Sequence, residues 1–147
     1  MSRLSSWPYT WEMFDEDVKS IITCVDFSIY SRIVGVASGG LPLLTALNNK
    51  IKLPWDIVRC VSYNGTRQEE LHSYFAHFHA GTKDGMVLIV DDVADSGQTL
   101  DVVSRGIKKH GEEVETLTLM YKPQSKHTPT FYVREVPDDV WIIFPWE

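Results

Sequence analysis

The sequence is short of cysteine, of net positive charge and of long apolar runs, and each absence removes a class of protein. Its two cysteines, Cys24 and Cys60, lie far apart in apolar surroundings, so we expect buried thiols in a reducing compartment rather than a disulfide or metal site. The formal net charge of −6 and the lack of a basic cluster argue against a nucleic-acid partner. Residues 1–9 hold no long apolar stretch, which predicts neither a signal peptide nor a membrane span. We therefore expect a cytoplasmic protein with no membrane partner.

The chain also lacks repeats and low-complexity segments, and its 147 residues, 44% of them hydrophobic, fit a single domain with a substantial core. After Thr10, a plausible N-cap, apolar residues from Trp11 to Val25 recur at helical spacing. Further helices are expected at 41–47 and 99–110, and strands at 32–37, 55–62, 86–91 and 115–121, with 131–133 and 140–144 as short terminal strands that could pair with each other. This alternation predicts an α/β fold, with a mainly parallel central sheet flanked by helices.

Residues 64–84 form a polar segment between the second and third expected strands. The segment contains no convincing strand and is too long for an ordinary connection, so we expect a flexible lid. His77 and His79 form a pair that could bind zinc, with His72 nearby, but no third ligand has the spacing of a zinc site. We interpret these histidines as lid or surface residues.

The stretch from Val87 to Leu100 says most about function. An apolar, β-branched run ends in two adjacent carboxylates, a third carboxylate follows, and small polar residues then lead into an amphipathic helix. The polar residues are Asp91, Asp92, Asp95, Ser96, Gly97, Gln98 and Thr99. Residues 91–98 are therefore expected to form a strand-to-helix turn at the carboxyl end of a strand, where open α/β sheets bind ligands.

The chemistry of this turn suits a phosphorylated sugar. Asp91 and Asp92 can accept hydrogen bonds from ribose hydroxyls or bind Mg²⁺ through oxygen, and Asp92 is the expected metal ligand. The backbone amides of residues 96–99 and the hydroxyls of Ser96 and Thr99 suit a 5′-phosphate at the helix start. The structural alternative is a solvated acidic turn, but three carboxylates in five residues repel one another and would give such a turn little stability.

A second glycine-containing turn, Ser38-Gly39-Gly40, follows the first expected strand. Two glycines let the backbone approach a ligand closely, and the start of the following helix adds amide donors. An ordinary strand-to-helix turn is the alternative. Because the chain also contains the acidic loop from Asp91 to Thr99, ligand binding is the favoured interpretation of this turn.

These motifs resemble the signature by which type I phosphoribosyltransferases bind 5-phosphoribosyl-1-pyrophosphate (PRPP). The signature is an apolar strand, two acids, two small or apolar residues, Asp, Thr or Ser, Gly, any residue and Thr, and residues 87–99 match it. The resemblance implies the type I phosphoribosyltransferase fold, with Mg²⁺ as cofactor. It also implies that Ser38, Gly39 and Gly40 hold the pyrophosphate, and that Asp95 assists proton movement at the imidazole nitrogen of a purine.

The end of the chain is similar to that of the bacterial xanthine-guanine phosphoribosyltransferases. Those proteins have Lys-Pro after the corresponding strand and a tail of the form Val/Ile-Pro-x-Asp-x-Trp-Ile…Pro-Trp-Asp; here Lys122-Pro123, residues 136–142 and Pro145-Trp146-Glu147 match. The resemblance implies a base-binding hood at 122–147 and a homo-oligomer, either a dimer or a tetramer. Lys122 can donate to O6 of a 6-oxopurine, the ring of Trp141 can stack on the base, and the backbone of Ile142 can pair with its other edge. Burial of Trp141 in the core is the alternative.

Two departures from the family pattern bear on function. Ser38 stands where relatives have an arginine, which can bind pyrophosphate bidentately. We therefore expect either a lower affinity for PRPP or compensation by another cation, such as Arg67 or Lys83. The chain ends directly after Pro145-Trp146-Glu147, which predicts a reduced cap over the base. We expect a purine-salvage enzyme that transfers 5-phosphoribosyl from PRPP to guanine, xanthine or hypoxanthine and releases pyrophosphate. A non-catalytic regulator that senses PRPP or nucleotides is the alternative, and transfer to a pyrimidine is disfavoured.

Overall fold

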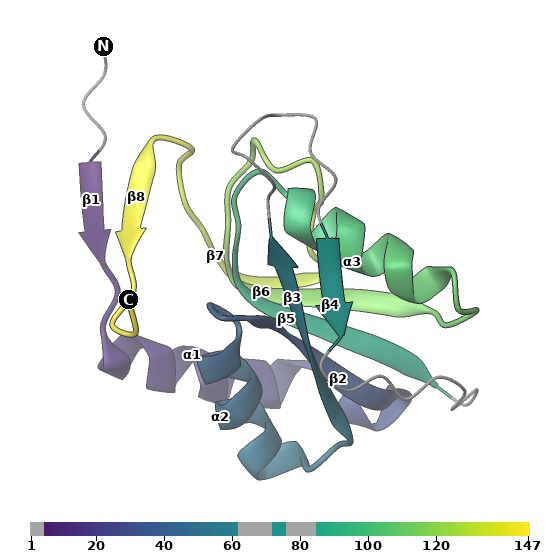
Figure 1. Cartoon of the computed structure of the whole chain (residues 1–147). Helices are drawn as coiled ribbons and strands as arrows, with labels where there is room; N and C mark the ends of the chain where they lie inside the picture. The colour runs from purple at the N-terminus through teal and green to yellow at the C-terminus, as the bar shows by residue number, and fades with distance from the viewer. Residues whose placement is uncertain (1–4, 62–71, 76–84) are drawn as a thin grey trace.

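A six-stranded sheet forms the centre of the structure (Figure 1). The structure is a computed structural model, and it describes residues 5–61, 72–75 and 85–147. The strand order of the sheet is β4-β3-β2-β5-β6-β7, and β4 alone runs antiparallel to its neighbour. The strands are β1 Ser5–Pro8, β2 Tyr30–Ala37, β3 Trp55–Val61, β4 His72–Phe75, β5 Met86–Ala94, β6 Val114–Tyr121, β7 Phe131–Glu135 and β8 Val140–Ile143. The helices are α1 Trp11–Cys24, the short 3₁₀ helix η1 Phe27–Ile29, α2 Leu41–Ile51 and α3 Gln98–Lys108.

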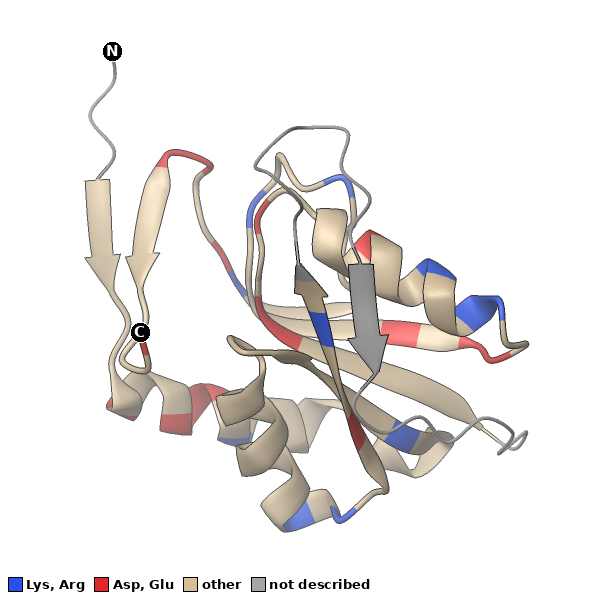
Figure 2. Cartoon of the chain, viewed as in Figure 1, with Lys and Arg blue, Asp and Glu red and all other residues tan. Residues whose placement is uncertain are grey.

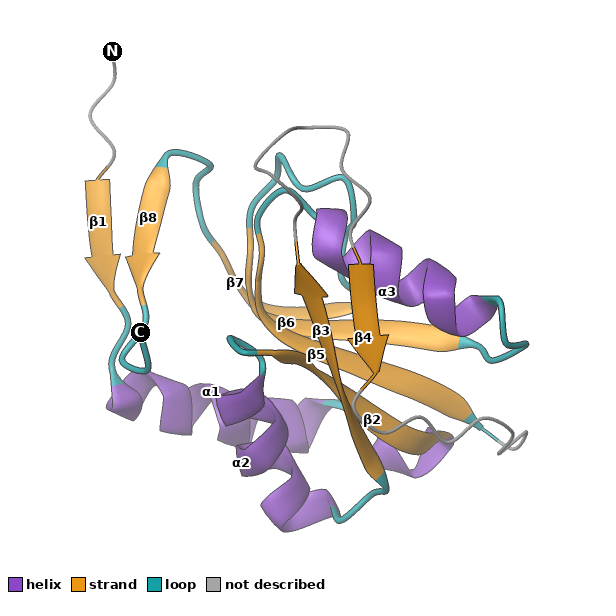
Figure 3. Ribbon diagram, viewed as in Figure 1, coloured by secondary structure: helices purple, strands orange, loops and turns teal. Residues whose placement is uncertain are grey.

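Helices cover both faces of this sheet, as Figure 3 shows, with α1 and α2 on one face and α3 on the other. Successive side chains of the central strands β2 and β5 point to opposite faces. Ile33 and Leu88 therefore join the core under α1 and α2, while Val34 and Ile89 join the core under α3, and all four are fully buried. Strands buried on both faces need a continuous apolar run, which explains why these two strands were clear in the sequence.

Local signals set several helix boundaries. The hydroxyl of Thr10 accepts a hydrogen bond from the amide of Met13 at 3.1 Å, which confirms Thr10 as the N-cap of α1. Helix α2 has a proline in its first turn and continues four residues beyond the expected end at 47, to Ile51. Its C-cap, Lys52, has a left-handed backbone.

Three expectations about strands were wrong. Segment 131–133 does not pair with 140–144, because β7 joins the main sheet beside β6 while β8 pairs in parallel with β1. The segment expected to lack a strand contributes β4, which pairs with β3. The central strand β5 runs to Ala94 instead of ending at 91, because it stays paired with β6 to its end. The rest of the predicted lid, including His77 and His79, lies outside the described residues.

The two-stranded ribbon of β1 and β8 stands apart from the main sheet, and the C-terminus lies beside the start of α1 (Figure 1). A polar network fastens this region to the core. Buried Asp17 on α1 accepts a 2.6 Å hydrogen bond from the hydroxyl of Tyr9 and a bidentate pair of 2.9 Å bonds from Arg134 at the end of β7. A buried carboxylate is tolerated when charge-assisted bonds satisfy it.

A second buried ion network lies at the opposite end of the strands. Arg32 on β2 is 1% exposed and pairs with Asp56 on β3 and, at 2.8 Å, with Glu112 after α3. Figure 2 shows that the Lys and Arg positions of the described residues are spread over several helices, strands and loops. None of the helices in the described ranges is long and apolar enough to cross a membrane.

The cysteines differ from expectation. Cys24 is exposed at the end of α1, so the prediction of a buried thiol is wrong there. Cys60 on β3 is half-buried, and both thiols are free.

Candidate active site

The site lies where the chain changes direction across the sheet. From β2 the chain goes through α2 to β3 on one side, whereas from β5 it goes through α3 to β6 on the other. The adjacent strands β2 and β5 therefore form a topological switch point, and a crevice opens outside their carboxyl ends. The loop 38–40 follows β2, and the observed part of the predicted turn 91–98, residues 95–97, follows β5. Strand order thus brings together motifs more than fifty residues apart in the chain.

Gly39 lies directly against the carboxylate of Asp92. A Cβ atom on Gly39 would be 2.3 Å from Oδ2 of Asp92, so only glycine allows the 38–40 loop to come this close. Gly40 is equally confined, because a Cβ there would be 2.6 Å from the carbonyl oxygen of Val90. The Gly40 amide donates to the Val36 carbonyl at 2.8 Å, and the Ala37–Ser38 peptide bond is cis.

Asp91 and Asp92 are two adjacent carboxyl groups at the carboxyl end of β5. Oδ1 of Asp91 accepts a bond from the Asp92 amide at 2.8 Å, and Oδ1 of Asp92 accepts from the Val93 amide at 2.7 Å. Burial and the neighbouring Asp92 carboxylate raise the pKa of Asp91 well above the ordinary value, and burial also raises the pKa of Asp92. A cation placed here would stabilise the charged forms. Two carboxylates with room for phosphate oxygens and water fit Mg²⁺.

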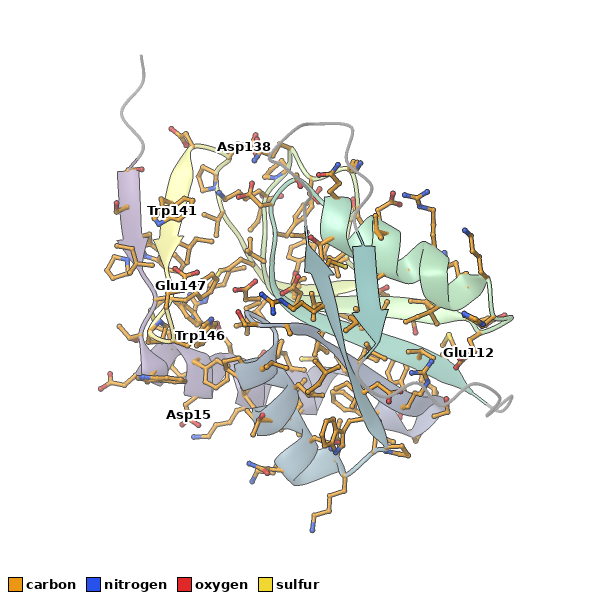
Figure 4. All side chains as sticks on the ribbon, in the orientation of Figure 1. Asp15, Glu112, Asp138, Trp141, Trp146 and Glu147 are labelled. Carbon is orange, nitrogen blue, oxygen red and sulfur yellow. The ribbon has the colours of Figure 1, made fainter. Side chains whose placement is uncertain are left out.

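A cleft of about 940 Å³ opens beside this pair and is lined by Ser38, Gly39, Asp91, Asp92, Thr99 and Trp146, among others. The ring of Trp146 is held by aromatic neighbours, including Phe144, on which it stacks at 4.8 Å between centroids (Figure 4). The buried Nε1 of Trp146 has no hydrogen-bond partner in the described part of the chain. It nevertheless lies close enough to Asp92 to offset part of the rise that burial causes in the pKa of Asp92. Cys60 lines the same cleft, and burial, with the Asp91 charge, raises the pKa of its thiol to about 11.

The loop after β5 presents the start of α3. The expected turn 91–98 is shorter than predicted, because Asp91 to Ala94 belong to the strand and only residues 95–97 turn. Gly97 has a φ of 81°, and a Cβ there would lie 2.4 Å from the hydroxyl of Ser125, so glycine is required on two grounds. Ser96 accepts a bond from the Gln98 amide at 3.3 Å. The first amides of α3, including that of Thr99, point out of the helix end, where an anion is stabilised.

Asp95 faces a loop that follows β6. The ammonium group of Lys122, which is 5% exposed, lies 3.2 Å from Oδ2 of Asp95. Oδ1 of Asp95 accepts a bond from the side-chain amide of Gln124. The structure thus brings together two residues that the sequence pointed out, Asp95 and Lys122, and adds Gln124, which the sequence patterns did not single out. Gln124 carried no signal, because it lies outside every motif.

The expected base-binding residues on β8 lie in different environments. Ile142 is buried among core residues, whereas Trp141, its neighbour along the strand, is 55% exposed. The alternative of a core tryptophan is therefore wrong for Trp141, whose place on β8 is labelled in Figure 4. In the part of the chain that the structure describes, no ring contact joins Trp141 to another aromatic side chain, and neither Trp141 nor Lys122 lines the 940 Å³ cleft.

Comparisons with known proteins agree with this geometry. The sequence profile of the phosphoribosyl transferase domain matches residues 13–147, and the chain belongs to this family. A xanthine-guanine phosphoribosyltransferase of Nitratidesulfovibrio vulgaris (strain Hildenborough) is 28% identical over 143 residues, which cover 96% of this chain and 84% of that protein. The crystal structure of a purine phosphoribosyltransferase from Pyrococcus horikoshii is 31% identical, with a TM-score of 0.83 over 97% of this chain and 94% of that one.

More distant structures show the fold alone. The xanthine-guanine-hypoxanthine phosphoribosyltransferase of Helicobacter pylori is 24% identical with a TM-score of 0.84, covering 97% of this chain and 94% of that chain. A Neisseria gonorrhoeae protein solved with bound ppGpp is 18% identical with a TM-score of 0.81, covering 100% and 92%. The expected type I phosphoribosyltransferase fold is confirmed, and the protein is an enzyme of the glycosyltransferase class that transfers a phosphoribosyl group.

Proposed function

We propose that this enzyme transfers the 5-phosphoribosyl group from PRPP to N9 of a 6-oxopurine, namely guanine, xanthine or hypoxanthine, and releases pyrophosphate in purine salvage. The observation that carries the proposal is the contact of Gly39 with Asp92, which places the two glycine loops on either side of one crevice. The names of the relatives support a purine as the acceptor. The cytoplasm is the proposed location.

Each loop has a separate part in this proposal. The amides and side chains of Ser96, Gly97, Gln98 and Thr99 bind the 5′-phosphate, while Ser38, Gly39 and Gly40 face the pyrophosphate. Asp91 and Asp92 accept hydrogen bonds from the ribose hydroxyls, and Asp92 also holds Mg²⁺, which when bound neutralises charge on the leaving pyrophosphate. Ser38 lacks the positive charge of the arginine that relatives have at this position. Arg67 and Lys83, the cations proposed to replace that charge, lie outside the described residues.

The reaction breaks the bond from C1′ of the ribose to pyrophosphate and forms the bond from C1′ to N9. The transition state is oxocarbenium-like, so catalysis depends on positioning and on donors to the leaving group. Asp95 assists proton movement at the imidazole nitrogen of the purine, and Lys122 donates to O6. The hood, residues 122–147, covers the base with Trp141 and the Ile142 backbone. A homodimer or homotetramer is the proposed assembly.

Pyrophosphate release from PRPP and Mg²⁺ tests this function, with guanine, xanthine and hypoxanthine supplied in turn. We expect release with at least one of these purines and none with uracil. Asp95→Asn should lower kcat about 100-fold with the KM for PRPP little changed, because it removes a proton acceptor and not a phosphate ligand. Tight PRPP binding without release in the wild-type protein would support the regulatory alternative, and an unchanged kcat in Asp95→Asn would remove Asp95 from the chemistry.

A further inference from the structure

Two loops run side by side at the proposed base site. The amide of Lys122 donates to the carbonyl of Ala94 at 3.0 Å, and the amide of Lys126 donates to the carbonyl of Ser96 at 2.9 Å. These two backbone bonds fasten the loop 122–126 to the loop that carries Asp95. Asp95 therefore lies opposite the middle of 122–126, which is where Gln124 stands.

Both carboxylate oxygens of Asp95 are engaged by this loop. Oδ2 faces the ammonium group of Lys122 at 3.2 Å, and Oδ1 accepts the bond from Nε2 of Gln124. The Asp95 side chain is 45% exposed, so packing alone does not fix its orientation. Within the described residues, the hydrogen bonds from these two side chains are the ones that hold it.

Lys122 cannot by itself hold the carboxylate of Asp95 in position once a base is bound. An ammonium group that donates to O6 of a purine is drawn toward that oxygen, and the carboxylate of Asp95 would follow it through their ion pair. The neutral amide of Gln124 holds the second oxygen without neutralising the charge on Asp95. It thus keeps Asp95 in place while Lys122 turns to the base.

Gln124 is itself anchored by the turn before β8. Its backbone amide donates to Oδ1 of Asp138 at 2.9 Å, and Asp138 lies in the turn that leads into β8 (Figure 4). Asp138 occupies the open position of the Val/Ile-Pro-x-Asp pattern, and Gln124 follows the Lys-Pro pair without belonging to it. The link from this turn to Asp95 is therefore made by residues that the family pattern does not specify.

We propose that Gln124 is a positioning residue that orients the carboxylate of Asp95 toward the purine, with Asp138 fixing the backbone of Gln124. This inference rests on the proposed function and deepens it. It assigns the orientation of Asp95 to a neutral amide on the loop after β6.

A double-mutant cycle tests the assignment. Gln124→Met keeps the length of the side chain and removes its donor, so kcat/KM for the purine should fall about tenfold, with the KM for PRPP unchanged. In the Asp95→Asn background the same substitution should have almost no further effect, because the group it orients is already altered. Calorimetry with GMP gives a readout without turnover, and Gln124→Met should weaken GMP binding about fivefold.

The matched control is Thr128→Ala, an exposed side chain on the same stretch after β6, which should change neither kcat/KM nor GMP affinity. Equal losses from Gln124→Met in the wild-type and Asp95→Asn backgrounds would overturn the positioning role while leaving the transferase function intact. A raised KM for PRPP in Gln124→Met would overturn it too, since that result indicates general damage to the site. A wild-type protein that neither uses a purine nor binds GMP would overturn the function, and this assignment with it.

Discussion

Replacing Gly39 by alanine is expected to weaken PRPP binding and slow turnover without unfolding the protein. The added Cβ would lie 2.3 Å from Oδ2 and 2.8 Å from Cγ of Asp92, so one of the two groups must move by about 1 Å to reach ordinary contact. Asp92 cannot swing freely, because its Oδ1 accepts a 2.7 Å bond from the Val93 amide. A misplacement of about 1 Å at a reacting centre costs about 100-fold in rate, which corresponds to about 2.7 kcal/mol.

The assay is steady-state pyrophosphate release with PRPP varied at saturating purine. We expect kcat/KM for PRPP to fall about 100-fold in Gly39→Ala, while its urea midpoint stays close to that of the wild-type protein. Gly106→Ala is the matched control, because nothing lies within 4 Å of the position a Cβ would occupy there. That helical substitution should leave activity unchanged and stabilise the fold by about 0.5–1 kcal/mol. Wild-type kinetics in Gly39→Ala would refute the assignment of this contact to the PRPP site.

Two predictions concern stability. Asp91 has a raised pKa in the folded protein, so the protonation of its carboxyl group contributes to the unfolding free energy. This contribution is full below about pH 3.8, the ordinary pKa of Asp, and is lost as pH rises through the pKa of the folded state. The unfolding free energy should therefore decline less with rising pH in Asp91→Asn than in the wild-type protein, and parallel curves from urea titrations would contradict this linkage. Arg32→Met should cost about 3–5 kcal/mol of unfolding free energy, because it leaves Asp56 buried without its partner. A urea-measured loss below about 1 kcal/mol would show that Asp56 is rehydrated or protonated instead.

Much of the fold was accessible from the sequence because central strands and capped helices leave strong local signals. The apolar runs of β2 and β5 are buried on both faces, and Thr10 caps α1 through a bond to a residue three positions away. Weak elements were missed for the opposite reason. The four-residue strands β1 and β4 are too short to show a period, and β1 in addition pairs with β8 at the other end of the chain.

The candidate site divides in the same way. The sequence alone identified three site residues, because carboxylates are unusually dense just before a helix start: Asp91, Asp92 and Asp95. Gln124 could not be found, because an exposed glutamine after a proline is ordinary in sequence and gains meaning only when another loop brings a carboxylate to it. The exposure of Trp141 was likewise undecidable, since it depends on which face of β8 packs against the core.

The sequence by itself determined the two loops, the strand and helix types around them and the family, because each of these depends on residues within about a dozen positions of one another. Only the tertiary structure decided that Gly39 touches Asp92, that β8 pairs with β1, and that Gln124 reaches Asp95. Those contacts join segments separated by tens of residues or more, and their closeness follows from the strand order across the sheet, which local patterns of hydrophobicity and charge do not encode.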